Sequence, residues 1–379
     1  MLLAISNVPR DYAWGSTTLL AELEGRAAAA GPEAEVWFGD HPGDPADFGQ
    51  GGTLDEITGG ALPYLLKLLA AADPLSIQVH PTREQAAAGF AREAALDPAD
   101  PARNYRDDNH KPELIVALRD GFLALGGIRP LGDTRRLLDA LGDAPAVTQL
   151  RSWLDGTGEG KSDADVLRAV IARLLGGEAD DVVAGVIAAL DGATSEEFGA
   201  ELGAIRDIAA RNPGDAGVVV ALLMNLVELQ RGEAIFLRAG LLHAYVAGIG
   251  VEIMAASDNV LRGGLTPKHI DVPELLSVLD TTPGAVPVLR PSADDAVTAY
   301  PVPVPDFALR RARIDGELSI DVSGPAIVLA TAGEVQVTTD AGGLVVPVGA
   351  AVFASADERT LVLRGTGEAF VAEPGVSTP

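Results

Sequence analysis

Short apolar runs dominate the first 130 residues, and glycine, proline and aspartate separate them. Runs such as "EVWFG", "LSIQVHP" and "ELIVAL" with turn residues on both sides predict β-strands joined by loops. The stretch 82–94, "TREQAAAGFAREA", is an exception. Its Thr82 can cap a helix with Gln85 at the capping-box position, and its alanines have high helix propensity, so a helix is expected there.

Between about residues 131 and 228 the apolar positions recur every three or four residues. Four segments show this spacing: "GDTRRLLDALGD", "SDADVLRAVIARLLGG", "EADDVVAGVIAALDG" and "SEEFGAELGAIRDIAARN". Each begins near Asp, Ser or Glu, and most end at Gly or Asn, which are helix start and stop signals. The sequence therefore predicts a helical segment, followed by a return to β structure near residue 233.

The C-terminal part again has a strand-like pattern. Residues 282–306 are rich in proline and are expected to form a connector or an extended edge. Beyond them come short apolar runs at regular spacing with glycine between them: "LSIDVS", "AIVLATAG", "EVQVTTD", "LVVPVGAAVFAS", "RTLVLRG" and "EAFVAEP". This pattern predicts a β-sandwich or barrel, and the block contains no histidine.

Composition limits the possible partners and chemistry. The chain has 379 residues, enough for two or three modules, and 47% of them are hydrophobic, so a folded protein is expected. With 28 basic and 54 acidic residues the net charge is −26, which argues against nucleic acid and anionic membranes as partners. Because cysteine is absent, disulfides and thiolate metal sites are excluded, and any metal must bind histidine, carboxylate or amide groups.

The N-terminal stretch "MLLAISNVPRDYAWGS" lacks the basic region and the cleavage context of a signal peptide. No apolar run reaches the roughly 18 residues that a membrane-spanning helix needs. We therefore expect a cytoplasmic protein that does not use a membrane as a partner.

The run "LSIQVHP" places polar residues in a strand that would otherwise be apolar. Ser76, Gln78 and His80 share one face of this strand, because successive side chains alternate between faces. That face is either a solvated edge or half of a metal site. Glu113 and His243 lie in other apolar runs and need partners if buried. A divalent cation such as Zn²⁺, Mn²⁺, Fe²⁺ or Co²⁺ would satisfy Gln78, His80, Glu113 and His243 together, whereas a lone histidine is more often structural.

Four cationic residues stand out in this acidic chain. Lys67 lies within "LPYLLKLLA", where its ammonium must either pair with an anion or extend from a strand edge to solvent. Arg262 and Lys268 lie in "SDNVLRGGLTPKH", and Lys111 directly precedes Pro112. Together they are candidates for binding a small anion.

Six stretches of the chain form a recognisable set: "YAWGS", "EVWFGDHP", "LPYLLKLL", "SIQVHP", "NHKPELIVAL" and "GEAIFLRAGLLHAYVAGIGVEIMAASDNVLRGGLTPKHID". In this order they closely resemble the motifs of type I phosphomannose isomerases, which are zinc enzymes of the cupin superfamily. The match covers about residues 6–130 and 228–280, whereas the rest agrees in layout only. Arg238, where many relatives have proline, and "IRP" after "LALGG" are minor departures that touch no proposed ligand.

The resemblance implies a reaction and roles for individual residues. The reaction is the interconversion of D-mannose 6-phosphate and D-fructose 6-phosphate through an enediol or enediolate, with one Zn²⁺ per chain. The implied zinc ligands are Gln78, His80, Glu113 and His243; the implied catalytic arginine is Arg262; Lys111 and Lys268 resemble active-site lysines; Lys67 and Ser76 resemble phosphate-side contacts. For the acid–base residue, Lys111, His110 and a zinc-bound water all remain candidates.

The resemblance also implies a mainly β fold with two cupin-type jelly rolls and a helical insertion. The expected division is 1–130 and 229–285 for a catalytic jelly roll, 131–228 for the helical domain, and 286–379 for a second jelly roll without a metal site. A monomer that binds a sugar phosphate is expected. Two alternatives stay open: an iron-dependent oxygenase, whose two-histidine, one-carboxylate set overlaps this one, and a sugar-phosphate-binding cupin protein without catalysis.

Overall fold

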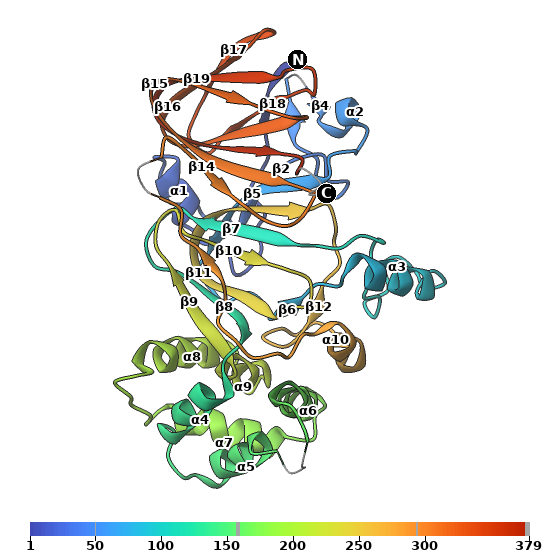
Figure 1. The fold of residues 1–379 in the computed structure, drawn as a ribbon, viewed down its shortest axis with the longest axis vertical. Coiled ribbons are helices and arrows are strands. Elements are labelled where there is room, and N and C mark those ends of the chain that lie inside the picture. Colours follow the sequence, from blue (N-terminus) through green and yellow to red (C-terminus); the bar gives the residue numbers. More distant parts are fainter. Residues whose placement is uncertain (50, 157–159, 293–294, 376–379) are drawn as a thin grey trace.

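The computed structural model describes residues 1–49, 51–156, 160–292 and 295–375. Figure 1 shows three tiers: a sheet built mainly from the C-terminal strands, a second sheet in the middle, and a group of helices at the opposite end. Both sheets are antiparallel, so the chain is mainly β with a helical insertion, as predicted. Within the described ranges, no helix combines the length and apolar character needed to cross a membrane.

The first sheet combines the two ends of the sequence. Its strands are, in spatial order, β14 (Val297–Tyr300), β15 (Ala308–Asp321), β19 (Thr360–Glu373), β16 (Ala326–Thr339), β18 (Ala351–Ala354), β1 (Leu2–Ser6), β3 (Asp47–Phe48) and β4 (Gly52–Thr53), with β17 (Gly342–Val346) beside β16. The predicted division did not anticipate that β1, β3 and β4 would extend the C-terminal sheet. Pairing between such distant segments leaves no local signal in the sequence.

Several strands of this sheet are longer than the sequence pattern predicted. "AIVLATAG" and "EVQVTT" form the single strand β16, and the last two predicted strands form the single strand β19. The glycines taken as turns lie inside these strands. Gly333 has φ +72, and a Cβ atom there would lie 2.1 Å from the Thr366 carbonyl oxygen, so the close approach of two backbones requires glycine at this position.

The second sheet is organised around β11 (His243–Ala255), which has neighbours on both sides. Its order is β12 (Leu261–Arg262), β6 (Gln78–Val79), β11, β7 (Glu113–Ala117), β10 (Ala234–Leu237) and β13 (Val288–Leu289). β11 also pairs with β5 (Tyr64–Ala71), which in turn pairs with β2 (Glu35–Phe38). It pairs as well with β8 (Phe122–Ile128), which in turn pairs with β9 (Met224–Leu229). The β structure thus resumes at Met224 rather than near residue 233, because the apolar run 217–229 divides into a short helix and a strand that periodicity alone does not separate.

Within the described ranges, the helices are α1 (Leu19–Leu23), α2 (Asp55–Thr58), α3 (Arg83–Arg92), α4 (Leu131–Asp139), α5 (Pro145–Leu154), α6 (Asp163–Leu175), α7 (Asp180–Leu190), α8 (Gly199–Arg211), α9 (Gly217–Leu222) and α10 (Val272–Val278). The predicted helix at 82–94 is confirmed together with its capping box between Thr82 and Gln85. The four helices predicted between 131 and 228 are also present as α4, α6, α7 and α8. The remaining helices, α1, α2, α5, α9 and α10, were not predicted.

Two apolar cores connect the tiers. One fills the space between the two sheets, where Tyr64 and Leu66 of β5 belong to the same buried cluster as Phe353 and Phe370 of the first sheet. The other joins the helical segment to the second sheet and contains the whole of α9 with Ile77 and Val79. The strand that carries Gln78 therefore packs against the helical segment, and the position of its polar face depends on both the second sheet and the helices.

Substitution of Gly333 tests the close backbone approach in the first sheet. Gly316→Ala, also at a positive φ but with open space around it, should cost only backbone strain, about 1–2 kcal/mol of unfolding free energy. Gly333→Ala should cost about 1–3 kcal/mol more, because its methyl group meets the Thr366 carbonyl. Urea unfolding of both variants measures the difference, and equal losses would contradict this account.

Candidate functional site

Three neighbouring strands bring polar residues to one place in the second sheet. Gln78 of β6 lies opposite His243 of β11 and opposite Arg262 of β12. Residues that are directly opposite in antiparallel strands project from the same face. The polar face of "LSIQVHP" is therefore extended on both sides by chemically active residues, which favours a binding site over a solvated strand edge.

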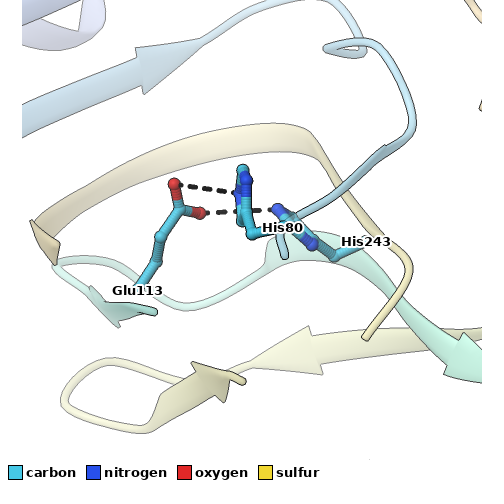
Figure 2. A group of neighbouring side chains, drawn as sticks. All are labelled: His80, Glu113 and His243. Carbon is cyan, nitrogen blue, oxygen red and sulfur yellow. Dashed lines mark ion pairs between the residues drawn. The ribbon is translucent and has the colours of Figure 1, made fainter. Parts of the chain in front are cut away.

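Beside this face, His80, Glu113 and His243 converge on one point (Figure 2). His80 Nε2 lies 3.3 Å from Glu113 Oε1, and His243 Nε2 lies 3.4 Å from Glu113 Oε2. All three side chains are buried, and their possible ligand atoms lie within 4.8 Å of one another. No other set of three histidine or acidic side chains comes together in this way in the part of the chain that the structure describes.

The two imidazoles are held with Nε2 facing Glu113. His80 Nδ1 donates a hydrogen bond to the Asn259 carbonyl at 2.7 Å, and His243 Nδ1 donates to the Leu241 carbonyl at 3.0 Å. His80 is fully buried, yet its Nε2 makes no hydrogen bond within the described residues. A buried ring nitrogen without a partner, whose other nitrogen is fixed by a carbonyl, is typical of a metal ligand.

The protonation states also suit a cation. Burial lowers the pKa of His80 to about 4, although the Glu113 carboxylate opposes this, so the ring is neutral near pH 7. Burial alone would raise the pKa of Glu113, but the adjacent Lys111 ammonium is the largest opposing influence, and that pKa lies well below the usual value. Neutral imidazole and ionised carboxylate are the forms that bind metals. The three residues therefore fit a divalent cation.

Gln78 can supply a fourth donor. Its amide nitrogen donates a hydrogen bond to Ser76 Oγ at 3.2 Å, which leaves the amide oxygen as the atom able to coordinate a cation. Both residues line a cavity of about 560 Å³. The same cavity is lined by the predicted residues Lys67, Lys111, Glu113, His243, Arg262 and Lys268. His80 lies behind this lining.

His110 was one candidate for the acid–base residue, and it is not among the described residues that line the cavity. Its Nε2 lies 2.8 Å from Asp306 Oδ2 and 2.9 Å from Arg83 Nη2. Lys111, the next residue, lines the cavity, with its Nζ 3.0 Å from Glu113 Oε1. Consecutive side chains that lead into a strand turn to different sides, and here only the second of the two faces the cavity.

Lys67 is paired inside the cavity wall. Its ammonium lies 3.2 Å from Glu252 Oε2, 3.8 Å from Glu35 Oε2 and 5.2 Å from the centroid of the Trp37 ring. Burial would lower the pKa of Lys67, but the two carboxylates outweigh it and raise that pKa above its usual value. The lysine therefore pairs with anions and does not extend from a strand edge to solvent.

Sequence reasoning missed Glu35 and Glu252, although both line the cavity. Glu252 lies directly opposite Lys67 across β11 and β5, and burial raises the pKa of its carboxyl group. The signal was available, because each glutamate interrupts an apolar run, "AEVWF" and "GIGVEIM". A charge in such a run needs a partner of opposite sign on a neighbouring strand.

Arg262 and Lys268 are cations without a compensating anion. Burial and the nearby Arg106 lower the pKa of Arg262, and burial and Arg262 lower the pKa of Lys268. Within the described ranges, neither side chain forms an ion pair of the kind that Lys67 and Lys111 form. Two unbalanced cations on a cavity wall, in a chain of net charge −26, indicate a site for an anion.

Comparison with known proteins gives a consistent result. Residues 2–131 match the family model described as "Phosphomannose isomerase type I, catalytic domain". The chain is 38% identical to mannose-6-phosphate isomerase from Salmonella typhimurium, with 95% of this chain and 96% of the relative covered. It is 31% identical to mannose-6-phosphate isomerase from Homo sapiens, with 93% of each covered.

Solved structures agree. A crystal structure of a lysine-to-alanine mutant of phosphomannose isomerase from Salmonella typhimurium has a TM-score of 0.88 at 35% identity, over 99% of this chain and all of that chain. A crystal structure of mannose 6-phosphate isomerase bound with zinc and yttrium has a TM-score of 0.87 at 35% identity, with the same coverage. The similarity thus extends through the helical segment and the C-terminal sheet.

Replacing Glu113 tests the metal site. Glu113→Ala removes the carboxylate that both imidazoles face, so zinc affinity should fall at least about 100-fold, beyond the roughly 10–100-fold typical of losing an outer-shell partner. Metal analysis after dialysis against a chelator measures this loss. Gln78→Leu is the matched test of the fourth donor and should weaken zinc binding less. Retention of stoichiometric zinc in Glu113→Ala would exclude this site.

Proposed function

This chain belongs to the mannose-6-phosphate isomerase family, and we propose that it interconverts D-mannose 6-phosphate and D-fructose 6-phosphate. One observation carries the proposal: one cavity is lined by members of a buried metal-ligand set and by two cations that form no ion pair with another described residue. The metal-ligand set suits a carbonyl compound and the two cations suit a phosphate, so a sugar phosphate suits the cavity as a whole.

We propose that Gln78, His80, Glu113 and His243 hold one Zn²⁺ per chain. The unpartnered His80 Nε2 and the low pKa of Glu113 support this assignment, and zinc is present in one of the similar crystal structures. When bound, zinc supplies Lewis-acid polarisation of the sugar oxygens at C1 and C2.

The reaction moves a proton from C2 to C1 and another between O1 and O2, with no net oxidation. We assign the carbon-to-carbon transfer to Lys111, whose amino group reaches the cavity beside Glu113 and whose amine form can accept a proton. Arg262 lies opposite Gln78 and would stabilise the negative charge that develops on the oxygen of the enediolate.

We place the phosphate near Lys268 and Ser76, where the charge of Arg262 also contributes. Lys67 was expected on the phosphate side, but Glu35 and Glu252 already balance its charge. We therefore assign Lys67 to the hydroxyl groups of the sugar, which need a hydrogen-bond donor and not an unbalanced cation.

All proposed site residues come from residues 1–130 and 229–285 of one chain, so we propose these two ranges as the catalytic unit and the monomer as sufficient for activity. We also propose the cytoplasm as the place of action. An iron-dependent oxygenase and a non-catalytic sugar-binding protein were the alternatives, and neither matches the names of the relatives.

A coupled assay tests the proposed activity. Zinc-loaded protein should convert mannose 6-phosphate to fructose 6-phosphate, which glucose-6-phosphate isomerase and a dehydrogenase convert with formation of NADPH. Metal content is measured on the same preparation, and a chelated sample serves as the control. Zinc-replete protein without turnover would refute the isomerase proposal, and oxygen uptake in its place would favour the oxygenase.

Arg262→Ala separates chemistry from metal binding. The substitution removes a fixed positive charge from the cavity but no zinc ligand, so kcat should fall about 100- to 1,000-fold while zinc content stays unchanged. Steady-state kinetics and metal analysis of the same variant provide the measurement. Loss of zinc together with activity would make Arg262 a structural residue of the site.

A further inference from the structure

The loop that carries Lys268 contains an unusual backbone conformation. Leu265 has φ +56, and it is the one residue other than glycine with a positive φ in the described part of the chain. Its side chain is buried, and it lines the cavity together with Thr266, Pro267 and Lys268. A leucine in this region of φ is strained, so the surrounding structure must hold it there.

The first residue of α9 lies directly against the backbone of this loop. A Cβ atom on Gly217, the first residue of α9, would lie 2.5 Å from the Leu265 nitrogen and 2.7 Å from the Gly264 Cα. A Cβ atom on Gly264 would lie 2.4 Å from the Gly217 Cα. Because neither glycine has room for a side chain, α9 and the loop lie as close as two backbones can.

Asp215 joins the same two elements with one carboxylate. Its Oδ1 accepts a hydrogen bond from the Gly217 N–H at 2.7 Å, and its Oδ2 accepts one from the Thr266 N–H at 3.1 Å. On the other side, the loop pairs with Ile77, which donates to the Gly264 carbonyl at 3.0 Å. Leu265 is therefore fixed between the helical segment and the strand that leads to Gln78.

The chain beyond the loop is also attached to the helices. Arg168 of α6 donates hydrogen bonds to the carbonyl groups of Leu276 and Leu279, the latter at 2.8 Å. Thr281 donates to the Ala164 carbonyl at 2.8 Å. The helical segment thus anchors the segment 264–281 at both ends, and the exposed residues 267–269 lie between these anchors.

From these contacts we infer that the helical segment positions the sugar-phosphate site. Asp215 and Gly217 hold Leu265 in its strained conformation and thereby keep Lys268 and Arg262 directed into the cavity. They are positioning residues, since neither lines the cavity. The inference rests on the proposed function, because it takes the phosphate of the substrate as the group that these cations bind.

The test uses the full zinc-loaded chain with Gly217→Ala and Asp215→Asn. Gly217→Ala forces α9 away from the loop, and Asp215→Asn replaces one of the two accepting oxygens of Asp215 by an amide nitrogen. Gly203→Ala in α8 is the matched control, because a methyl group there meets no atom within 4 Å. Zinc content, thermal unfolding, and kcat and KM for mannose 6-phosphate are measured, together with binding of glucitol 6-phosphate, which has the phosphate but no carbonyl group.

Both variants should keep their zinc and bind glucitol 6-phosphate at least about tenfold more weakly, with a rise in KM that exceeds the fall in kcat. The control should match the parent protein in zinc content, kinetics and ligand binding, and should unfold at an equal or higher temperature because alanine favours a helix. Parent-like binding in both variants would overturn the inference, and if Gly217→Ala does not fold, Asp215→Asn decides alone. A parent protein that neither binds nor isomerises sugar phosphates would instead overturn the proposed function, and this inference with it.

Discussion

The buried carboxylate of Glu113 is the group on which the arrangement of the site depends. It lies within 3.4 Å of both His80 Nε2 and His243 Nε2, and Lys111 lies on its remaining side. An ionised carboxylate in a sheet interior is stable only when several donors or cations surround it. Lys111 meets part of this requirement, and a cation held between Glu113 and the two Nε2 atoms would meet the rest, because neutral rings that donate through Nδ1 offer no N–H to the carboxylate.

The charges within the cavity are distributed unevenly, and this uneven distribution favours one orientation of a bound substrate. Glu35 and Glu252 enclose Lys67, so that wall is nearly neutral although it is built from ions. The opposite situation holds at Arg262 and Lys268, which have no anion beside them. A substrate with one anionic end and one polyhydroxyl end therefore has a single favourable orientation.

The parts of the site that lie close together in sequence were the easiest to predict. Gln78 and His80 were singled out from strand alternation, and their partnership with Glu113 and His243 was one of the alternatives until the family resemblance implied it, because no local pattern links residues so far apart. His110 and Lys111 were both candidates for the acid–base residue, and only Lys111 lines the cavity, because adjacent residues in a motif can turn to different sides. Glu252 was overlooked because its partner lies on another strand. Within the fold, helices with sustained apolar periodicity were found, the short α10 was missed despite its Asp271 cap, and glycines inside long strands were mistaken for turns.

The pairing of β1 with β18 has a consequence for how the chain acquires its structure. Leu2 lies opposite Ala354, so β1 is synthesised long before β18, the strand that pairs with it on this side, exists. Contacts of such large sequence separation slow folding, because the entropy of closing a long loop is lost before the contact can stabilise anything. Until then the edge of β1 that faces β18 is unpaired, although β3 can already pair with its other edge, and unpaired edges are sites of aggregation at which chaperones act.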